Sequence, residues 1–465
     1  MFAVKPVFLV TDIMLFATVF LLLYVCCCIC RDKNARLPWW QLLSNKLYNS
    51  CGVILLFFLA ITILDSIHFR ALETDSLTSS QHYSSEVKSV FDVMISPLGM
   101  DMETSYSKPF ATESLNKKYS KNPDGSYHSY HPQLKLVNSL TSSELVKAMF
   151  HNFFMVTLSF FSLMLLFSFF FRSSKGLWHS FVVLYGKNYN PIAYQAILTA
   201  FVIVLFLVEV IFLSHHFHIF GTNKIGVDVF YQTLKSIRTG VVIGTITTLF
   251  SLPLAIFLGI SSGYFGKRVD DIIQYIYTTI STIPGILLIT AAIMSLQLWM
   301  GKHASSFETM YESADLRLLL ICFVLGITGW PALCRLIRGE TLKIREMDYI
   351  TAAHMLGVSK IRVLFKHILP NVMYIVLIVT VIDFSALVLA EAVLSYVGVG
   401  VASTTISWGN MINSARLELS RDPAVWWPLL ATFIFMFGLV LTANIFADGV
   451  RKIFDPRSYK SVVGK

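Results

Sequence analysis

Long, continuous runs of apolar residues dominate this chain, and shorter polar segments separate them. A run of roughly 20 apolar residues is long enough to cross the hydrocarbon core of a bilayer as a helix. A transmembrane β-barrel would instead need alternating segments of about ten residues. We therefore predict an all-α polytopic membrane helical bundle with about nine transmembrane helices. The expected spans are about 7–30, 51–69, 149–171, 193–214, 239–262, 272–296, 316–334, 372–399 and 427–447.

Two polar stretches interrupt this pattern. Residues 70–148 are rich in Ser, Tyr, Lys and Asn and carry a turn signal at 122–125, which predicts a small external subdomain or a loosely ordered loop. In 215–238 the second half has apolar residues at helical spacing. That spacing is typical of an amphipathic helix lying at the membrane interface. The apolar positions are Val227, Val229, Phe230, Leu234 and Ile237.

Composition and charge support a membrane protein and orient it. The chain is 55% hydrophobic and only 14% charged, with a net charge of +9. Lys and Arg gather in alternate loops, which the positive-inside rule places in the cytoplasm, so we expect the C-terminus inside and the N-terminus outside. Nucleic-acid binding is disfavoured because the basic residues are spread over several loops. These loops are 31–50, 172–192, 263–271 and 335–371, with the tail from 449.

A polar, basic segment between two apolar runs, DYITAAHMLGVSKIRVLFKHILPN at 348–371, is the most informative motif. Ala352 and Ala353 are small enough for another surface to approach the helix backbone closely. Gly357 is expected to turn the chain, and Leu369-Pro370 to end a helix. The segment therefore predicts a short helix-turn-helix that docks a cytosolic partner.

This segment resembles the EAA coupling loop of binding-protein-dependent ABC importer permeases. From His218 to Arg457 the chain resembles the C-type permease subunit of the dipeptide and oligopeptide importers, a family that also includes nickel importers. Further matching motifs are HIFGTNKIGVDVF (218–230), GYFGKRVDD (263–271), LAEAVLSYVGVG (389–400), SWGNMI (407–412) and DGVRKIFDPR (448–457).

The resemblance implies a domain organisation. The family permease has six spans, so residues 193–465 are expected to form the permease domain, with its cytoplasmic coupling loop at 335–371. Residues 1–192 would then be an N-terminal extension with about three transmembrane helices and the external loop 70–148. Alternatively, 51–69 is the first span of the family core, with insertions after it.

The resemblance also implies site residues. Thr351 stands where the family has Glu, so Asp348 is a candidate for the missing acid. Asn223 and Val227 replace an Asp and an Arg of the external signature. The coupling loop is expected to dock the ATPase through Asp348, Thr351, Ala352, Ala353, Gly357, Lys360, Leu369 and Pro370. The residues expected to face the binding protein are His218, Gly221, Thr222, Asp228, Trp408 and Gly409.

Three acids lie inside expected spans, where ionisable side chains are costly and often functional. Asp383 and Glu391 are eight residues apart, about 80° around a helix, so they are expected to share a face roughly. They and Glu209 either line the translocation path or gate, or are satisfied by neighbours in the bundle. For Glu391 a structural or gating role is favoured over contact with substrate.

Catalytic motifs are missing from the sequence. There is no G-x-x-x-x-G-K-[ST] phosphate loop, no H-E-x-x-H and no G-x-S-x-G. We therefore expect no enzyme activity and no cofactor in this chain, with ATP and Mg bound by partner ATPase subunits. The cysteines at 26, 27, 28 and 30 and the histidines at 215, 216 and 218 are more simply helix-end and signature residues than a metal site.

The sequence thus predicts the permease subunit of an ATP-driven ABC importer, most simply for dipeptides or oligopeptides. By resemblance, its partners are a second homologous permease, two cytosolic ATP-binding subunits and an extracytoplasmic substrate-binding protein. The expected location is the bacterial inner membrane. The rivals are an importer of nickel or antimicrobial peptides, an ion-driven secondary transporter and a membrane-embedded enzyme.

Overall fold

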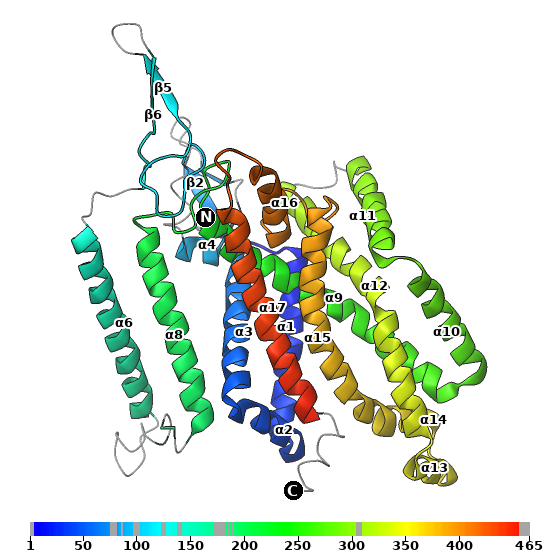
Figure 1. Cartoon of the computed structure of the whole chain (residues 1–465). Coiled ribbons are helices and arrows are strands. Elements are labelled where there is room, and N and C mark those ends of the chain that lie inside the picture. The colour runs from blue at the N-terminus through cyan, green and yellow to red at the C-terminus, as the bar shows by residue number, and fades with distance from the viewer. Residues whose placement is uncertain are drawn as a thin grey trace. The chain divides into compact units, whose positions relative to one another are not determined.

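The structure, a computed structural model, is a bundle of long helices with a small strand-containing part (Figure 1). It describes residues 4–74, 81–84, 87–95, 103–121, 127–136, 142–170, 183, 186–187, 190–303 and 309–454. Within these residues, nine helices are long and apolar enough to cross a membrane, which confirms the all-α polytopic prediction. They are α1 (Val10–Arg31), α3 (Lys46–Asp65), α6 (Ser142–Phe170), α8 (Pro191–Ser214), α9 (Val229–Phe265), α11 (Gly285–Lys302), α12 (Met310–Arg345), the continuous run Lys360–Tyr396, and α17 (Trp427–Phe454).

Shorter elements join these helices. The short helices are α2 (Lys33–Ser44), α4 (Val90–Met94), α10 (Lys267–Thr282), α13 (Asp348–Met355) and α16 (Trp408–Glu418). The run Lys360–Tyr396 consists of α14 (Lys360–Val363), a π-helical turn Leu364–Ile368 and α15 (Leu369–Tyr396).

The sixth expected span, 272–296, was wrong because the chain breaks within it. Ile283 is extended, with φ −82° and ψ 130°, and Pro284 caps the start of α11. Proline disfavours the helical conformation of the residue before it and lacks an amide hydrogen for the helix ladder. Only α11 is therefore a candidate span, and α10 is a separate amphipathic helix.

The helix of the seventh expected span continues well past residue 334, to Arg345. Ile337, Thr341 and Ile344 continue the buried stripe of α12, at 0%, 0% and 3% exposure. This helical spacing explains why a segment expected to be a basic loop is helix. The connection between α12 and α14 is consequently much shorter than the expected coupling loop 335–371.

The interfacial helix expected in 215–238 is also corrected. Residues from Val229 onward form the first turns of α9, which runs on without a break to Phe265. Phe230 and Ile237 are 1% and 0% exposed, so the apolar stripe packs against protein and not along a bilayer surface.

The described residues of segment 70–148 contribute strands to two small antiparallel sheets. Strand β2 (His68–Thr74) pairs antiparallel with β1 (Val4–Val7), β3 (Gln81–Tyr83) and β4 (Lys88–Ser89). Strands β5 (Lys118–Lys121) and β6 (Tyr127–Tyr130) form a separate antiparallel pair. The turn expected at 122–125 lies outside the described residues.

The chain forms two compact units. The first comprises Met1–Val7, Trp39–Arg238 and Ile406–Thr442, and the second Phe8–Pro38, Thr239–Thr405 and Ala443–Lys465. Both units take segments from each side of residue 192. The boundary between residues 192 and 193 stays a prediction about the permease domain.

Helix α1 is built into the second unit. The backbone amide of Thr11 donates to Asp315 Oδ2 at 3.1 Å, and its hydroxyl donates to the other oxygen of that carboxylate. Leu15 is fully buried in a cluster with Ile243 and Leu318. The first span therefore packs directly against α12, about three hundred residues later in the chain.

Candidate functional site

The segment between α12 and α14 folds as the expected helix-turn-helix. Helix α13 ends at Met355, and Gly357 takes the left-handed conformation with φ +75°. Its amide donates to His354 O at 3.0 Å, and the Val358 amide donates to Ala353 O at 3.1 Å. Glycine reaches this conformation without the steric cost that a Cβ atom imposes.

One face of α13 is locked into the protein. Ile350 and Ala353 are 0% and 8% exposed and lie in an apolar cluster with Ile344 and Val363. This corrects the expectation for Ala353: its small side chain allows close packing within this chain, and it is not available to a partner.

The opposite face of α13 is exposed, and at the C-terminal end of the helix it is apolar. Met355 and Leu356 are 85% and 83% exposed, which is unusual for large apolar side chains at a helix end. We call this pair, with Ala352, the apolar tip. The other expected docking residues that are exposed in the structure are Asp348, Thr351, Gly357, Lys360 and Pro370.

Pro370 does not end a helix, which corrects the sequence expectation. It lies in the first turn of α15, where a missing amide hydrogen is tolerated. The preceding turn, Leu364–Ile368, is π-helical. Such a wider turn changes the hydrogen-bond register before the proline, so the helix continues through it. Leu369 is half-buried.

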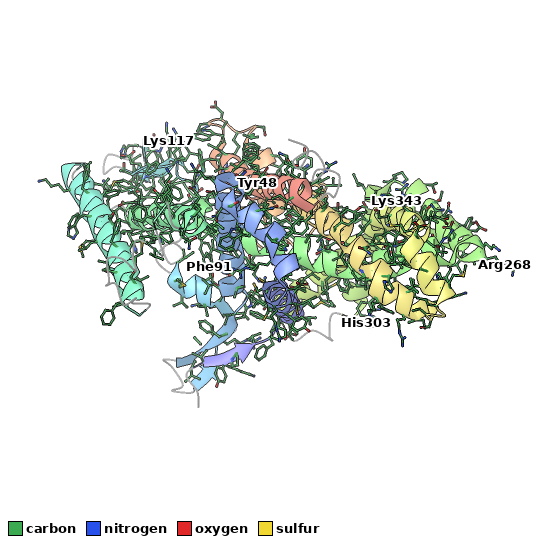
Figure 2. The ribbon with its side chains drawn as sticks, turned by 90° about the horizontal axis from the view of Figure 1, so that it is seen from below. Tyr48, Phe91, Lys117, Arg268, His303 and Lys343 are labelled. Carbon is green, nitrogen blue, oxygen red and sulfur yellow. The ribbon has the colours of Figure 1, made fainter. Side chains whose placement is uncertain are left out.

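A salt bridge connects α10 to α12 near this segment. Arg338 Nε and Nη2 donate to the two oxygens of Asp270 at 2.6 and 2.7 Å, and the Ser262 hydroxyl of α9 also donates to Asp270. The bonds from Arg338 lower the pKa of Asp270. The sequence contained Asp270 in the motif at 263–271 but did not reveal its partner. Arg268 lies at the same end of α10 as Asp270, and Lys343 lies at the same end of α12 as Arg338 (Figure 2).

Close helix packing surrounds that salt bridge. A Cβ atom on Gly263 of α9 would lie 2.6 Å from Thr341 Cβ, so only glycine permits this approach of α9 to α12. Arg345 Nη1 donates to Gly263 O at 3.2 Å. From α9, the hydroxyl of Tyr264 lies within hydrogen-bonding distance of His354 Nε2, at 3.3 Å. Helix α13 is thereby linked to α9 as well as to α12.

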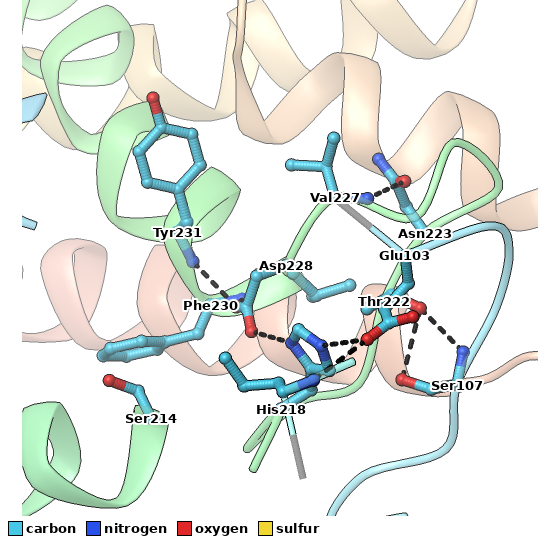
Figure 3. Close-up of polar contacts among 12 residues, drawn as sticks. Glu103, Ser107, Ser214, His218, Thr222, Asn223, Val227, Asp228, Phe230 and Tyr231 are labelled. Carbon is cyan, nitrogen blue, oxygen red and sulfur yellow. Dashed lines mark hydrogen bonds and ion pairs between the residues drawn. The ribbon is translucent and has the colours of Figure 1, made fainter. Parts of the chain in front are cut away.

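The external signature 218–228 is a folded turn that begins α9 (Figure 3). His218 Nδ1 donates to Asp228 Oδ2 at 2.7 Å. The other Asp228 oxygen accepts from the amides of Phe230 and Tyr231 at 2.7 and 3.1 Å, capping the helix start. Asn223 accepts from the amide of Val227 at 3.0 Å, which holds the turn closed.

The segment that contains Glu103 and Ser107 is fastened to this signature (Figure 3). The Ser107 amide donates to the Thr222 hydroxyl oxygen at 2.7 Å, and Glu103 lies 3.9 Å from His218 Nε2. A Cβ atom on Gly221 would lie 2.3 Å from Ser107 O. No pattern in the sequence indicated this contact, because the two segments are more than a hundred residues apart.

The residues expected to face the binding protein have buried side chains in this structure. His218, Thr222 and Asp228 are 2%, 0% and 3% exposed. Trp408 is 1% exposed and donates its indole N–H to Thr233 O at 3.1 Å. Gly221 and Gly409 are buried as well. Their side chains therefore support the folded signature turn, and the expectation that these residues face a binding protein stays a prediction.

The acids inside the spans have different surroundings. Glu391 is 2% exposed and accepts a hydrogen bond from Ser395 at 2.8 Å, whereas Asp383 is exposed. The expected shared face of α15 is therefore wrong: an arc of 80° is wide enough to separate the buried side of the helix from its surface. Glu209 on α8 has both oxygens buried, with no hydrogen-bond partner among the described residues. The path or gate role of all three acids stays a prediction.

The cysteines of α1 do not gather into a metal site. Cys26, Cys27, Cys28 and Cys30 are all exposed free thiols. Within the part of the chain that the structure describes, no three His, Cys, Asp or Glu side chains are arranged to hold a metal ion.

Comparison with known proteins gives consistent matches over about half of the chain. The family model "Binding-protein-dependent transport system inner membrane component" matches residues 255–459. The oligopeptide transport system permease protein OppC of Bacillus subtilis (strain 168) is 30% identical over 244 residues, covering 52% of this chain and 73% of the relative. The dipeptide transport system permease protein DppC of Lactococcus lactis subsp. cremoris (strain MG1363) is 30% identical over 241 residues, covering 52% and 64%.

A solved structure also matches part of the chain. An inward-facing conformation of the MetNI methionine ABC transporter covers 48% of this chain and 95% of the matched chain, with a TM-score of 0.34 and 16% identity.

Proposed function

Because this chain belongs to the family of inner-membrane permease components of binding-protein-dependent ABC transporters, on its dipeptide and oligopeptide branch, we propose that it forms half of the path for short peptides in an ATP-driven importer. Its relatives named as dipeptide and oligopeptide permeases support this substrate class. Membership of a transport-permease family supports a multi-pass membrane subunit of a larger complex.

The apolar tip is the observation that carries the proposal. A cytosolic ATPase subunit covers Met355 and Leu356, which are otherwise exposed to water at a cost. The ATPases bind ATP and Mg, because this sequence lacks a phosphate loop. The rest of the complex is a second homologous permease and an extracytoplasmic substrate-binding protein. The subunit resides in the bacterial inner membrane with its C-terminus in the cytoplasm.

The packing of α13 supports a mechanism for coupling. Ile350 and Ala353 pack into the same cluster as residues of α9, α12 and α15. Movement of α13 by the ATPases is therefore passed to these helices as a rigid push. Close-packed interfaces change between discrete arrangements more readily than they deform. The helices re-pack between inward-open and outward-open states.

The test replaces Leu356 by Asp in the complete complex. We expect ATPase association to weaken at least about tenfold, since a carboxylate cannot be buried in an apolar groove without a partner. Leu417→Asp is the matched control, because Leu417 is 67% exposed on α16, far along the chain from α13. Equal ATPase binding by both variants would refute the docking role.

Uptake into proteoliposomes tests the substrate class. ATP-dependent accumulation of labelled dipeptides or tripeptides is expected, with no accumulation of nickel ions. Accumulation driven by an ion gradient without ATP would instead support the secondary-transporter reading.

A further inference from the structure

The strand pair β5–β6 forms an arm that lies outside residues 255–459, which match the permease family. It lies beyond the ends of α3 and α8, two candidate spans of the same compact unit, and points away from them (Figure 1). All residues of both strands are exposed. Lys117 immediately precedes β5 and also points to solvent (Figure 2).

The chemistry of this arm is basic and aromatic on both faces. Residues 113–136 contain four lysines and two acids, Glu113 and Asp124, of which Asp124 lies outside the described residues. In the antiparallel register Lys118 faces Tyr130, and Lys121 faces Tyr127. Because these two pairs lie on opposite faces of the ribbon, each face presents a lysine beside a tyrosine. Tyr119 and Tyr127 are 75% and 71% exposed.

The base of the arm is held in place. The amide of Leu115 donates to Tyr106 O at 2.9 Å, and that of Leu134 donates to Thr112 O at 3.0 Å. Tyr106 and Leu134 are 2% and 5% exposed, so the segment that carries the strands has its own buried residues. Ser107 in turn anchors this segment to Thr222 of the signature. The arm is therefore presented from a fixed base.

The exposed edges of the ribbon favour a protein as the occupant. Among the described strands, β5 and β6 pair only with each other, so each has a free edge of backbone donors and acceptors. An isolated two-stranded ribbon is marginally stable in water and gains from a further strand or surface. Anionic lipids of the same membrane do not fit, because the ribbon projects away from the spans of its unit (Figure 1).

We propose that the β5–β6 arm is an additional docking site for an acidic surface of the soluble substrate-binding protein. This inference rests on the proposed importer function. Lysines on both faces draw the acidic surface in, tyrosines supply contact area with little side-chain entropy to lose, and the free strand edges supply hydrogen bonds.

The experiment uses the complete transporter in proteoliposomes and the peptide-binding protein that supports its uptake. The test variant is Lys118→Glu with Lys121→Glu, and a second variant is Tyr119→Ala with Tyr127→Ala. The control is Lys108→Glu with Lys302→Glu, which makes the same charge change at exposed lysines outside the arm. Dissociation constants are measured at low and high salt.

We expect the charge-reversal variant to bind the binding protein at least about tenfold more weakly than the control at low salt, with a smaller difference at high salt. The tyrosine variant should weaken binding at both salt concentrations. ATP hydrolysis without the binding protein should be unchanged, which excludes misfolding as the cause.

Equal binding by test and control variants would overturn the inference and leave the importer function standing. If no peptide-binding protein supports uptake by the wild-type transporter, both the function and the inference fail. Inorganic polyphosphate is the probe for an anionic polymer. If the lysine variant loses affinity for polyphosphate alone, the arm binds a polyanion and the proposal of a protein partner is wrong.

Discussion

At the scale of single residues, Asp270 joins three helices. Its carboxylate accepts hydrogen bonds from Nε and Nη2 of Arg338 and from the Ser262 hydroxyl, so it connects α10 to α12 and to α9. The two side chains of the ion pair are 14% and 24% exposed, so water screens the pair only in part. A hydrogen bond to a charged group of this kind contributes about 1.5–3 kcal/mol to the free energy of unfolding, as judged from mutations.

Replacing Asp270 by Asn should lower stability by roughly 2 kcal/mol at pH 7, because the amide has only one oxygen and cannot accept hydrogen bonds at two oxygens from Nε and Nη2 of Arg338. The pKa of Asp270 is lowered from its ordinary value of 3.8, so its contribution is complete above about pH 4 and is lost as the pH falls further. The wild type should therefore lose stability relative to the variant as the pH falls from about 4 to about 2. Thermal unfolding in detergent measures this, and a constant difference across that range would contradict it.

Gly226 offers a second test at this scale. A Cβ atom there would lie 1.8 Å from Glu103 O, and the residue has φ +82°. Gly398 has φ +86° but nothing within 4 Å of its Cβ position. Gly398→Ala should cost only the backbone strain, about 1–2 kcal/mol. Gly226→Ala should cost clearly more, because it also separates the two external segments. Equal melting temperatures would show that the segments are not fastened there.

At the scale of elements, the apolar runs predicted a helix at each of the nine candidate spans, but they missed the break at Pro284, the early start of α9 and the continuation of α12 to Arg345. Gly357 was predictable because the motif needs a turn that only glycine forms cheaply. The break at Pro284 and the passage through Pro370 were not, since proline ends, starts or interrupts a helix depending on the register of its neighbours. The burial of His218 and Thr222 was also hidden, because their partners Glu103 and Ser107 come from a distant segment.

The turn between α13 and α14 gives a prediction about coupling. Gly357→Ala should strain this turn by about 1–2 kcal/mol without any overlap, since nothing lies within 4 Å of the new Cβ. We expect peptide transport per ATP hydrolysed to fall several-fold, because α13 no longer keeps one fixed angle. Gly339→Ala on α12 is the matched control: it meets no atom within 4 Å and has helical geometry. Equal coupling ratios in the two variants would exclude this role for the turn.

At the scale of the whole molecule, each compact unit draws on both the N-terminal part and the family-matched part of the chain. Ser107 satisfies Thr222, and Asp315 accepts from Thr11, so polar groups of the matched part rely on residues before 193. The sequence indicated an N-terminal extension because the family motifs begin only at His218. Spacing along the chain carries no information on which spans pack together.

A fragment of residues 193–465 should accordingly insert into the membrane but unfold in detergent at a lower temperature than the full chain. In this fragment buried Thr222 loses its hydrogen bond from Ser107, and Asp315 loses those from Thr11. Each loss costs about 1–3 kcal/mol of stability. Co-expression with residues 1–192 should restore the melting temperature. A fragment that melts like the full chain on its own would show that the first 192 residues are dispensable for folding.

The pairing of Thr11 with Asp315 has a consequence for biosynthesis. At a ribosomal rate of about 5–20 residues per second, roughly 15–60 s pass between the emergence of these two residues. During that interval α1 resides in the membrane without its partner helix. If an insertase or a chaperone within the bilayer shields the face of α1 that later packs on α12, depletion of that factor should expose the nascent subunit to membrane proteases before α12 is made.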